Sequence, residues 1–297
     1  MNEYYNEIKN RIIDNEIYSK VKDYTKERNR VKTYFEIGKI LSEAGSKYGD
    51  KVIETYSKKL IVEVGKKYTT RTLRRIRQYY ITFKEEKWSQ VATKLTWSHY
   101  AELLAIKDDN KLEYYINISI KQNLSRNDLR NKIKNKEYER LSKETKDKLI
   151  NKEHIEISDF IKNPIIIRNK NNYEIISEKI LQQLILNDIE NFMNELGQSF
   201  CFIGSEYKIK IHNTYNYIDL LLYNIKFKCY VVIELKITEL KKEHIGQIQI
   251  YMNYIDKNLK TINEEETIGI IIVKKSNKYI LEYCSDKRVL SKEYILN

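Results

Sequence analysis

Apolar residues recur at helical spacing through the first half of the chain. The segment from 50 to 64 is typical, because its apolar side chains lie three or four positions apart: Val52, Ile53, Tyr56, Leu60 and Val64. This period places one apolar stripe on each helix and leaves the remaining faces polar. The pattern therefore predicts an all-helical N-terminal domain over residues 1–150.

The pattern changes in the second half, where apolar runs of strand length alternate with helical segments. It predicts helices over 173–196 and from about 243, and strands over 200–203, 207–211, 217–223, 228–237, 267–273 and 279–283. This order indicates a mixed α/β domain over 173–297, with helices flanking one sheet. Residues 151–172 are mostly polar and contain the only proline, Pro164, so they are predicted to be a linker, and its short apolar run Ile165–Ile167 is expected to dock on one domain.

Two apolar runs, 217–223 and 228–237, are separated by a link short enough for a hairpin. The second run is apolar at successive positions, which is typical of a central strand buried on both faces. A hairpin centred near residues 226–227 would place Asp219 opposite Glu234, and Lys236 shares the face of Glu234. Buried charges are costly unless they are paired or bind a metal. The two carboxylates therefore predict a Mg²⁺ or Mn²⁺ site, and the alternative is a buried salt bridge at a strand end.

The net charge of +12 is confined to the first half of the sequence. Residues 1–150 contain 34 Lys and Arg against 22 Asp and Glu, whereas residues 151–297 contain 20 of each. A basic domain joined to a neutral one suggests a part that holds a polyanion and a part that performs chemistry. The alternative is a solvated helical surface with an incidental excess of lysine.

An arginine-rich helix is predicted after residue 69, with the apolar stripe Leu73, Ile76, Tyr80 and Phe83. Another face carries arginines at helical spacing, with the last at its edge: Arg71, Arg74, Arg75 and Arg77. A short turn into such a helix is typical of a helix-turn-helix recognition element. These arginines are expected to contact phosphates, and the alternative is a solvated basic face.

Other function classes have little support in the sequence. Cys201, Cys229 and Cys284 lack metal-ligand spacing, and three reduced, buried cysteines favour a cytoplasmic protein. The first residues lack the apolar segment of a signal peptide, and no apolar run approaches the ~18 residues of a membrane span. His99 has no nucleophile or ligand pattern beside it, so a structural role is expected.

The spacing of Asp219, Glu234 and Lys236, D-x14-E-L-K, resembles the core of the PD-(D/E)XK nuclease superfamily. The segments YFEIGKILSE, TTRTLRRIRQYY, LTWSHY and IDLLLYN are similar, in that order, to YhcG-like bacterial proteins, which join a helical N-terminal domain to a PD-(D/E)XK domain. The resemblance implies a restriction-endonuclease-like fold, metal binding by the two carboxylates and a Lys that orients or activates the attacking water. It also implies that Gln247 contacts the metal-water network or the scissile phosphate and that Tyr251 lines the site; the alternative for both is ordinary helix polarity.

The sequence departs from this family at three positions. Gln182 stands where the first helix of the superfamily often has an acidic residue, so Glu178, one turn earlier, and Glu195, at the helix end, are candidate auxiliary acids. Glu206 replaces a usual Gln, and Asn163 replaces a usual Asp before the proline.

The sequence as a whole predicts a Mg²⁺- or Mn²⁺-dependent endonuclease acting on DNA. Its catalytic residues would be Asp219, Glu234, Lys236 and Gln247, and the helical domain would hold the nucleic acid. The alternatives are a non-catalytic nucleic-acid-binding protein and a subunit of a restriction or phage-defence complex. RNA remains open as a substrate, and a homodimer is expected if both strands of a duplex are cut.

Overall fold

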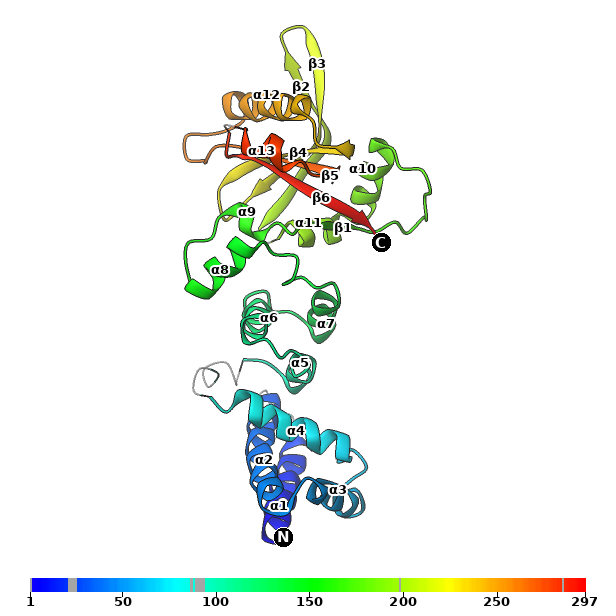
Figure 1. Ribbon diagram of the computed structural model, residues 1–297, viewed down its shortest axis with the longest axis vertical. Coiled ribbons are helices and arrows are strands. Elements are labelled where there is room, and N and C mark those ends of the chain that lie inside the picture. Colours follow the sequence, from blue (N-terminus) through cyan, green and yellow to red (C-terminus); the bar gives the residue numbers. More distant parts are fainter. Residues whose placement is uncertain (1, 21–25, 86–87, 89–93, 198, 285) are drawn as a thin grey trace. The chain divides into compact units, whose positions relative to one another are not determined.

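The chain divides into two compact units, Met1–Tyr138 and Glu139–Asn297, in a computed structural model (Figure 1). The structure describes residues 2–20, 26–85, 88, 94–197, 199–284 and 286–297. The first unit is helical and the second is a mixed α/β sheet with flanking helices, so the predicted fold class is confirmed. No described helix is long and apolar enough to cross a membrane.

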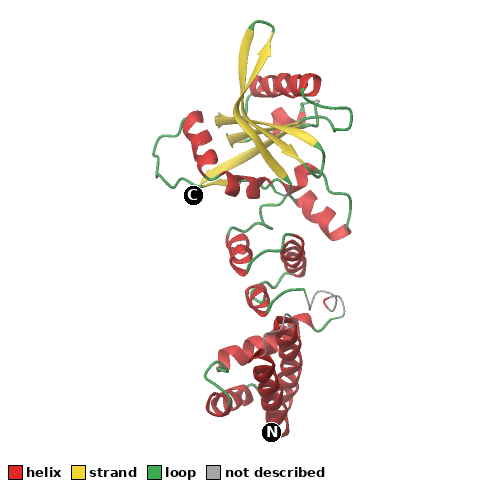
Figure 2. Cartoon of the chain, turned by 180° about the vertical axis from the view of Figure 1, so that it is seen from behind, coloured by secondary structure: helices red, strands yellow, loops and turns green. Residues whose placement is uncertain are grey.

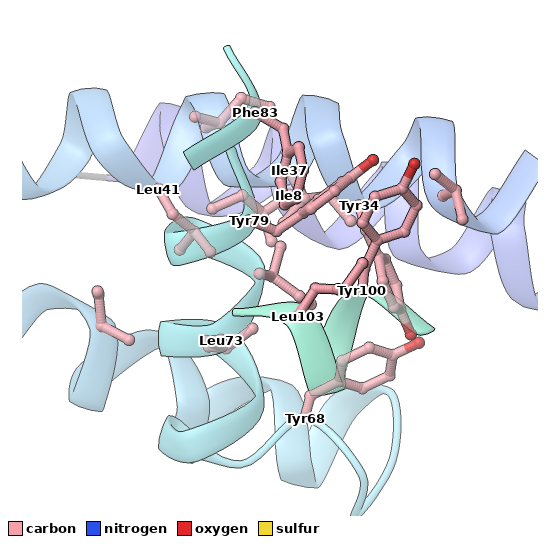
Figure 3. Close-up of a cluster of buried hydrophobic side chains, with 14 of the residues drawn as sticks. Ile8, Tyr34, Ile37, Leu41, Tyr68, Leu73, Tyr79, Phe83, Tyr100 and Leu103 are labelled. Atoms are coloured by element: carbon pink, nitrogen blue, oxygen red, sulfur yellow. The ribbon is translucent and has the colours of Figure 1, made fainter. Parts of the chain in front are cut away.

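The first unit packs its helices around one apolar core, part of which is drawn in Figure 3. Tyr68, Tyr79 and Tyr100 are fully buried in this core beside aliphatic residues from α1 and α2. The described helices are α1 (Asn2–Lys20), α2 (Lys26–Tyr48), α3 (Lys51–Glu63), α4 (Thr70–Phe83), α5 (Trp97–Leu103), α6 (Asp109–Lys121) and α7 (Arg126–Lys134).

Helix α4 begins after Thr69, whose side chain accepts a hydrogen bond from the Thr72 amide at 3.3 Å. The helix packs closely on α2 because Gly38 has no side chain: a Cβ there would lie 2.5 Å from the Ile76 carbonyl oxygen. The apolar stripe of α4 differs from the prediction, since Tyr79 is buried and Tyr80 only partly so. The ring nitrogens of His99 contact Thr96 Oγ1 at 2.7 Å and the Leu124 carbonyl oxygen at 2.9 Å, as a structural role would require.

The second unit is built on a six-stranded sheet in the order β1-β6-β5-β4-β3-β2 (Figure 2). Strands β2, β3 and β4 pair antiparallel, whereas β4, β5, β6 and β1 pair parallel. The strands are β1 (Ile165–Ile167), β2 (Phe200–Ile211), β3 (Thr214–Asn224), β4 (Cys229–Glu239), β5 (Ile268–Lys275) and β6 (Val289–Leu296). The helices are α8 (Lys143–Asn151), α9 (Ile157–Phe160), α10 (Glu178–Asn187), α11 (Ile189–Leu196), α12 (Lys242–Asn258) and α13 (Lys278–Glu282).

Strand β4 is buried on both faces, as its sequence predicts. Val231, Ile233 and Leu235 share a core with residues of α10 and α11, whereas Val232 belongs to a second core with residues of α12. Gly269 of β5 allows α12 to approach the sheet, because a Cβ there would lie 2.5 Å from Met252 Sδ. Opposite faces of the sheet therefore carry separate apolar layers, and β4 lies between them.

Several predicted elements differ from those observed. The segment 151–172 is not a simple linker, because it contains α9 and β1, and β1 pairs with β6. The helix predicted over 173–196 is interrupted at Asp188, which has non-helical backbone angles and forms ion pairs with Arg168 and Lys170. The predicted strand at 279–283 is the short helix α13, and strand β6 was not predicted. The three cysteines are free, but only Cys229 is buried and Cys201 is exposed.

Candidate active site

Asp219 lies where the pairing of β3 with β4 ends. The two strands pair from Asn224 opposite Cys229 to Leu220 opposite Ile233, and the same register continued by one step would place Asp219 opposite Glu234. Instead of a further backbone pair, the Asp219 carboxylate accepts a hydrogen bond from the Leu235 amide, with Oδ2 2.7 Å from the nitrogen. The hairpin predicted from the sequence thus brings the two carboxylates to neighbouring positions, and the β4 backbone fixes one of them.

The side chains of Glu234 and Lys236, both on β4, are largely buried. The Glu234 side chain is 2% exposed and that of Lys236 is 12% exposed, and Lys236 Nζ lies 3.2 Å from Glu234 Oε2. Glu178 of α10 brings a further carboxylate to this lysine, with Oε2 3.7 Å from Nζ. The second oxygen of Glu234, Oε1, is buried and has no hydrogen-bond partner among the described residues.

The charges of these groups are strongly coupled. Burial, together with the nearby Asp219 charge, raises the pKa of Glu234 to about 8 against the opposing effect of Lys236. Burial also raises the pKa of Asp219, although the Leu235 amide and Lys236 act in the other direction. For Lys236, burial favours the neutral amine, but the neighbouring carboxylates outweigh it and its pKa is raised. The lysine is therefore an ammonium ion, held beside carboxylates that are costly to ionise.

A divalent cation fits this donor set. Asp219 and Glu234 offer adjacent hard oxygen ligands, and the buried Glu234 Oε1 accepts no hydrogen bond from the residues that the structure describes. Within the described parts of the chain, no group of three or more His, Cys, Asp and Glu side chains could hold a metal ion. A site with two carboxylates suits Mg²⁺, which usually keeps several water ligands and is completed by substrate phosphate.

Helix α12 carries three polar residues that bear on the site, of which His244 is close enough for Lys236 to act on its pKa. Gln247 Nε2 donates a hydrogen bond to the Tyr251 hydroxyl at 3.1 Å, and Tyr251 is 6% exposed. His244, one turn before Gln247, has a pKa lowered by burial and by the positive charges of Lys236 and Lys241. His244 was not predicted as a site residue. The one feature of the sequence that could have indicated it is its position, as a titratable residue, shortly after the E-L-K segment.

Other candidate residues have different positions. Glu195 does not join the group formed by Asp219, Glu234 and Lys236. Its buried carboxylate forms an ion pair with Arg140 and accepts a hydrogen bond from the Ile166 amide at 2.9 Å, at the β1 edge of the sheet. Gln182 is a structural partner of the site, since its side-chain amide donates to the Asp219 carbonyl oxygen at 3.0 Å. The negative charge of Glu206 acts to raise the pKa of Asp219, so this residue is close to the carboxylate pair.

The four arginines of α4 belong to the first unit and differ in their partners. Arg74 Nη2 lies 2.9 Å from Glu54 Oε1, and Arg77 Nη1 lies 2.5 Å from Asp50 Oδ1. Arg71 and Arg75 are exposed and form no ion pair with the residues that the structure describes. The arginine face is thus partly neutralised by the neighbouring helix α3 and its N-cap.

Comparisons with known proteins agree with the two-part organisation. Residues 158–296 match the YhcG PDDEXK nuclease domain, and residues 7–140 match the DUF1016 N-terminal domain. Over 282 residues the chain is 23% identical to the Escherichia coli (strain K12) protein named "Putative nuclease YhcG". The alignment covers 81% of this chain and 75% of that protein.

Solved structures give weaker similarities. The match to a repair endonuclease from Pyrococcus abyssi covers 41% of this chain and 48% of the endonuclease chain, with 18% identity and a TM-score of 0.30. An EndoMS complex with double-stranded DNA matches 42% and 48% with 17% identity and a TM-score of 0.29. The aligned part therefore spans about half the length of each of these two structures.

Proposed function

Because one part of this chain matches the DUF1016 N-terminal domain and the other the YhcG PDDEXK nuclease domain, we propose that it is a metal-dependent endonuclease that hydrolyses phosphodiester bonds in DNA. The observation that carries the proposal is the convergence of Asp219, Glu234 and Lys236 at the end of the β3–β4 pairing. Two adjacent carboxylates with a buried ammonium ion are suited to hydrolysis of a phosphodiester, whose transition state gains negative charge.

Asp219 and Glu234 would hold Mg²⁺ or Mn²⁺. When bound, the ion polarises the phosphate and lowers the pKa of a coordinated water. The Leu235 amide keeps the Asp219 carboxylate in place, so one ligand is fixed before substrate arrives. Lys236, held by Glu234 and Glu178, stabilises either the attacking hydroxide or the charge that develops on the phosphate.

Gln247 and Glu178 have supporting roles in this proposal. The Gln247 side chain is oriented by Tyr251 and would bind the water network or the scissile phosphate. Glu178 is 47% exposed and approaches Lys236 from α10, so it is the better candidate than Glu195 for the auxiliary acid of the first helix.

The helical unit would bind the nucleic acid. Its support is the positive charge of residues 1–150 and the exposed guanidinium groups of Arg71 and Arg75. Arg74 and Arg77 would have to exchange their carboxylate partners for phosphate, so they are expected to contribute less.

The test is to incubate supercoiled plasmid with the purified chain and Mg²⁺ or Mn²⁺. Nicking or linearisation should disappear in EDTA and in Glu234→Ala, but it should persist in Glu239→Ala, which removes an exposed carboxylate from the same strand. If DNA is retained in a gel but never cut with any divalent metal, the endonuclease proposal is wrong. The chain would then be a binding protein or a subunit that requires a partner.

A further inference from the structure

Strands β2 and β3 continue beyond the candidate active site as a two-stranded hairpin. We call residues 207–217 the β2–β3 arm; Figures 1 and 2 show its tip extending past α12. Lys208 lies opposite Tyr217 and Lys210 opposite Tyr215 in the antiparallel register. Because directly opposite residues share a face, these two lysines and two tyrosines form one surface of the arm.

The chemistry of this surface is cationic and aromatic. Tyr215 and Tyr217 are each 52% exposed. Lys208 Nζ lies 3.8 Å from the centroid of the Tyr215 ring, and Lys210 Nζ lies 5.9 Å from it. Residues 207–217 contain no Asp or Glu. The arm itself therefore carries two positive charges and no acid, in a half of the chain that has no net charge.

The other face of the arm holds it in place. Ile209 is 1% exposed and belongs to the apolar core formed with α12, and Tyr207 and Ile211 pack against the same core. The arm is therefore amphipathic, and its buried face anchors it to the unit that contains the carboxylate pair. Its exposed tyrosines have no structural role in that core.

The arm leads directly to the candidate active site. Tyr217 precedes Asp219 by two residues in β3, which corresponds to ~7 Å along a strand, and Tyr215 is ~14 Å away. Lys208 lies two residues after Glu206, whose negative charge raises the pKa of Asp219. A nucleic-acid strand whose phosphate lies at the carboxylate pair would thus pass the arm within a few nucleotides.

We propose that the β2–β3 arm binds the substrate strand beside the scissile phosphate and selects DNA with unpaired nucleotides there. Lys208 and Lys210 contact phosphates, while Tyr217 and Tyr215 stack on bases that are not paired. The combination of exposed aromatic rings with acid-free positive charge is typical of surfaces that bind single strands. The inference rests on the proposed function for the bond that is cut, but the binding step itself needs no cleavage.

The test measures binding of the full chain in EDTA by fluorescence anisotropy, with a duplex that carries a single-stranded extension and with the same duplex fully paired. Tyr217→Ala should weaken binding to the extended duplex by roughly 5- to 100-fold, whereas Tyr217→Phe, which keeps the ring, should bind as the unaltered chain does. Both variants should bind the fully paired duplex equally. Equal affinities of Tyr217→Ala and the unaltered chain for the extended duplex would overturn the inference.

Salt dependence tests the lysines. Lys208→Ala combined with Lys210→Ala should reduce the slope of log affinity against log salt by about 1.4 to 1.8, the value for two lost phosphate contacts. The matched control combines Lys143→Ala with Lys257→Ala, which removes two charges from exposed positions of the same unit that have no ion pair among the described residues. The control should keep the original slope, and an equal reduction in both pairs would contradict a specific role of the arm.

These measurements separate the two proposals. A chain that binds through the arm but never cuts with any metal would overturn the endonuclease proposal and leave this inference standing. A chain that cuts DNA while its arm variants bind as the unaltered chain does would overturn this inference alone.

Discussion

Glu234 should make the metal-free protein less stable as the pH rises. Its carboxyl is 2% exposed, and its pKa is raised from the ordinary 4.5 to about 8 by burial and by Asp219. Between these two values the folded chain retains a proton that the unfolded chain has released, so the free energy of unfolding falls with increasing pH. At about 1.4 kcal/mol per pH unit, the loss between pH 5.5 and 7.5 is about 2–3 kcal/mol.

The substitution Glu234→Gln removes this titration while keeping the shape of the side chain. The difference in unfolding free energy between Glu234→Gln and the unaltered chain should therefore grow by about 2–3 kcal/mol in favour of the variant between pH 5.5 and 7.5. In a unit of this size, that change corresponds to roughly 5–10 °C in melting temperature. Titrating groups that do not interact with Glu234 are common to both proteins and cancel.

The assay is urea unfolding of the full chain, followed by circular dichroism in EDTA across this pH range. Glu239→Gln is the control, because Glu239 is an exposed carboxylate of the same strand. The difference in unfolding free energy between Glu239→Gln and the unaltered chain should not change with pH. Adding Mg²⁺ or Mn²⁺ should then stabilise the unaltered chain, more strongly at higher pH because the ligands must be deprotonated, but not Glu234→Gln. Stability curves of Glu234→Gln and the unaltered chain that remain parallel with pH would refute the reasoning.

Three further predictions concern the same unit. Lys236→Met should lower the rate of DNA cleavage at saturating metal by about 10²–10³-fold, as loss of one group that stabilises transition-state charge does; a change of less than twofold in initial rate would exclude that role. Arg140→Ala should destabilise the chain by about 3–5 kcal/mol in urea unfolding, because it leaves Glu195 buried without its ion pair; a loss below 1 kcal/mol would contradict the burial. Gly269→Ala should cost about 1–3 kcal/mol in the same assay by forcing α12 away from the sheet, and an unchanged midpoint would mean that Met252 and Ile248 move aside freely.

The hairpin that carries the candidate site was predictable because its signal is local. A continuous apolar run along β4 and a short link to β3 determine which residues face each other, and the observed register is the predicted one. Capping was predictable for the same reason: Thr69 and Ser125 accept amide hydrogen bonds from residues three positions later. Strand β4 can be predicted without knowing the rest of the fold, except that both of its faces are covered.

The failures involve partners that are distant in sequence. Glu195 reads as a possible site acid until Arg140 and the β1 backbone are seen to occupy its carboxylate. The apolar run Ile165–Ile167 was expected to dock on a domain, but that it forms strand β1 depends on its pairing with β6 near the C-terminus. The contribution of Glu178 could be proposed from its position one turn before Gln182, but its approach to Lys236 depends on how α10 packs against the sheet.

The most direct test of the central claim is the rate of plasmid nicking during a titration with Mg²⁺ or Mn²⁺, measured for the unaltered chain, Asp219→Asn and Glu239→Gln. If Asp219 holds the catalytic metal, cleavage by the unaltered chain and by Glu239→Gln should depend saturably on the metal, and Asp219→Asn should not cleave at any metal concentration. Cleavage by Asp219→Asn at the rate and metal dependence of the unaltered chain would contradict it.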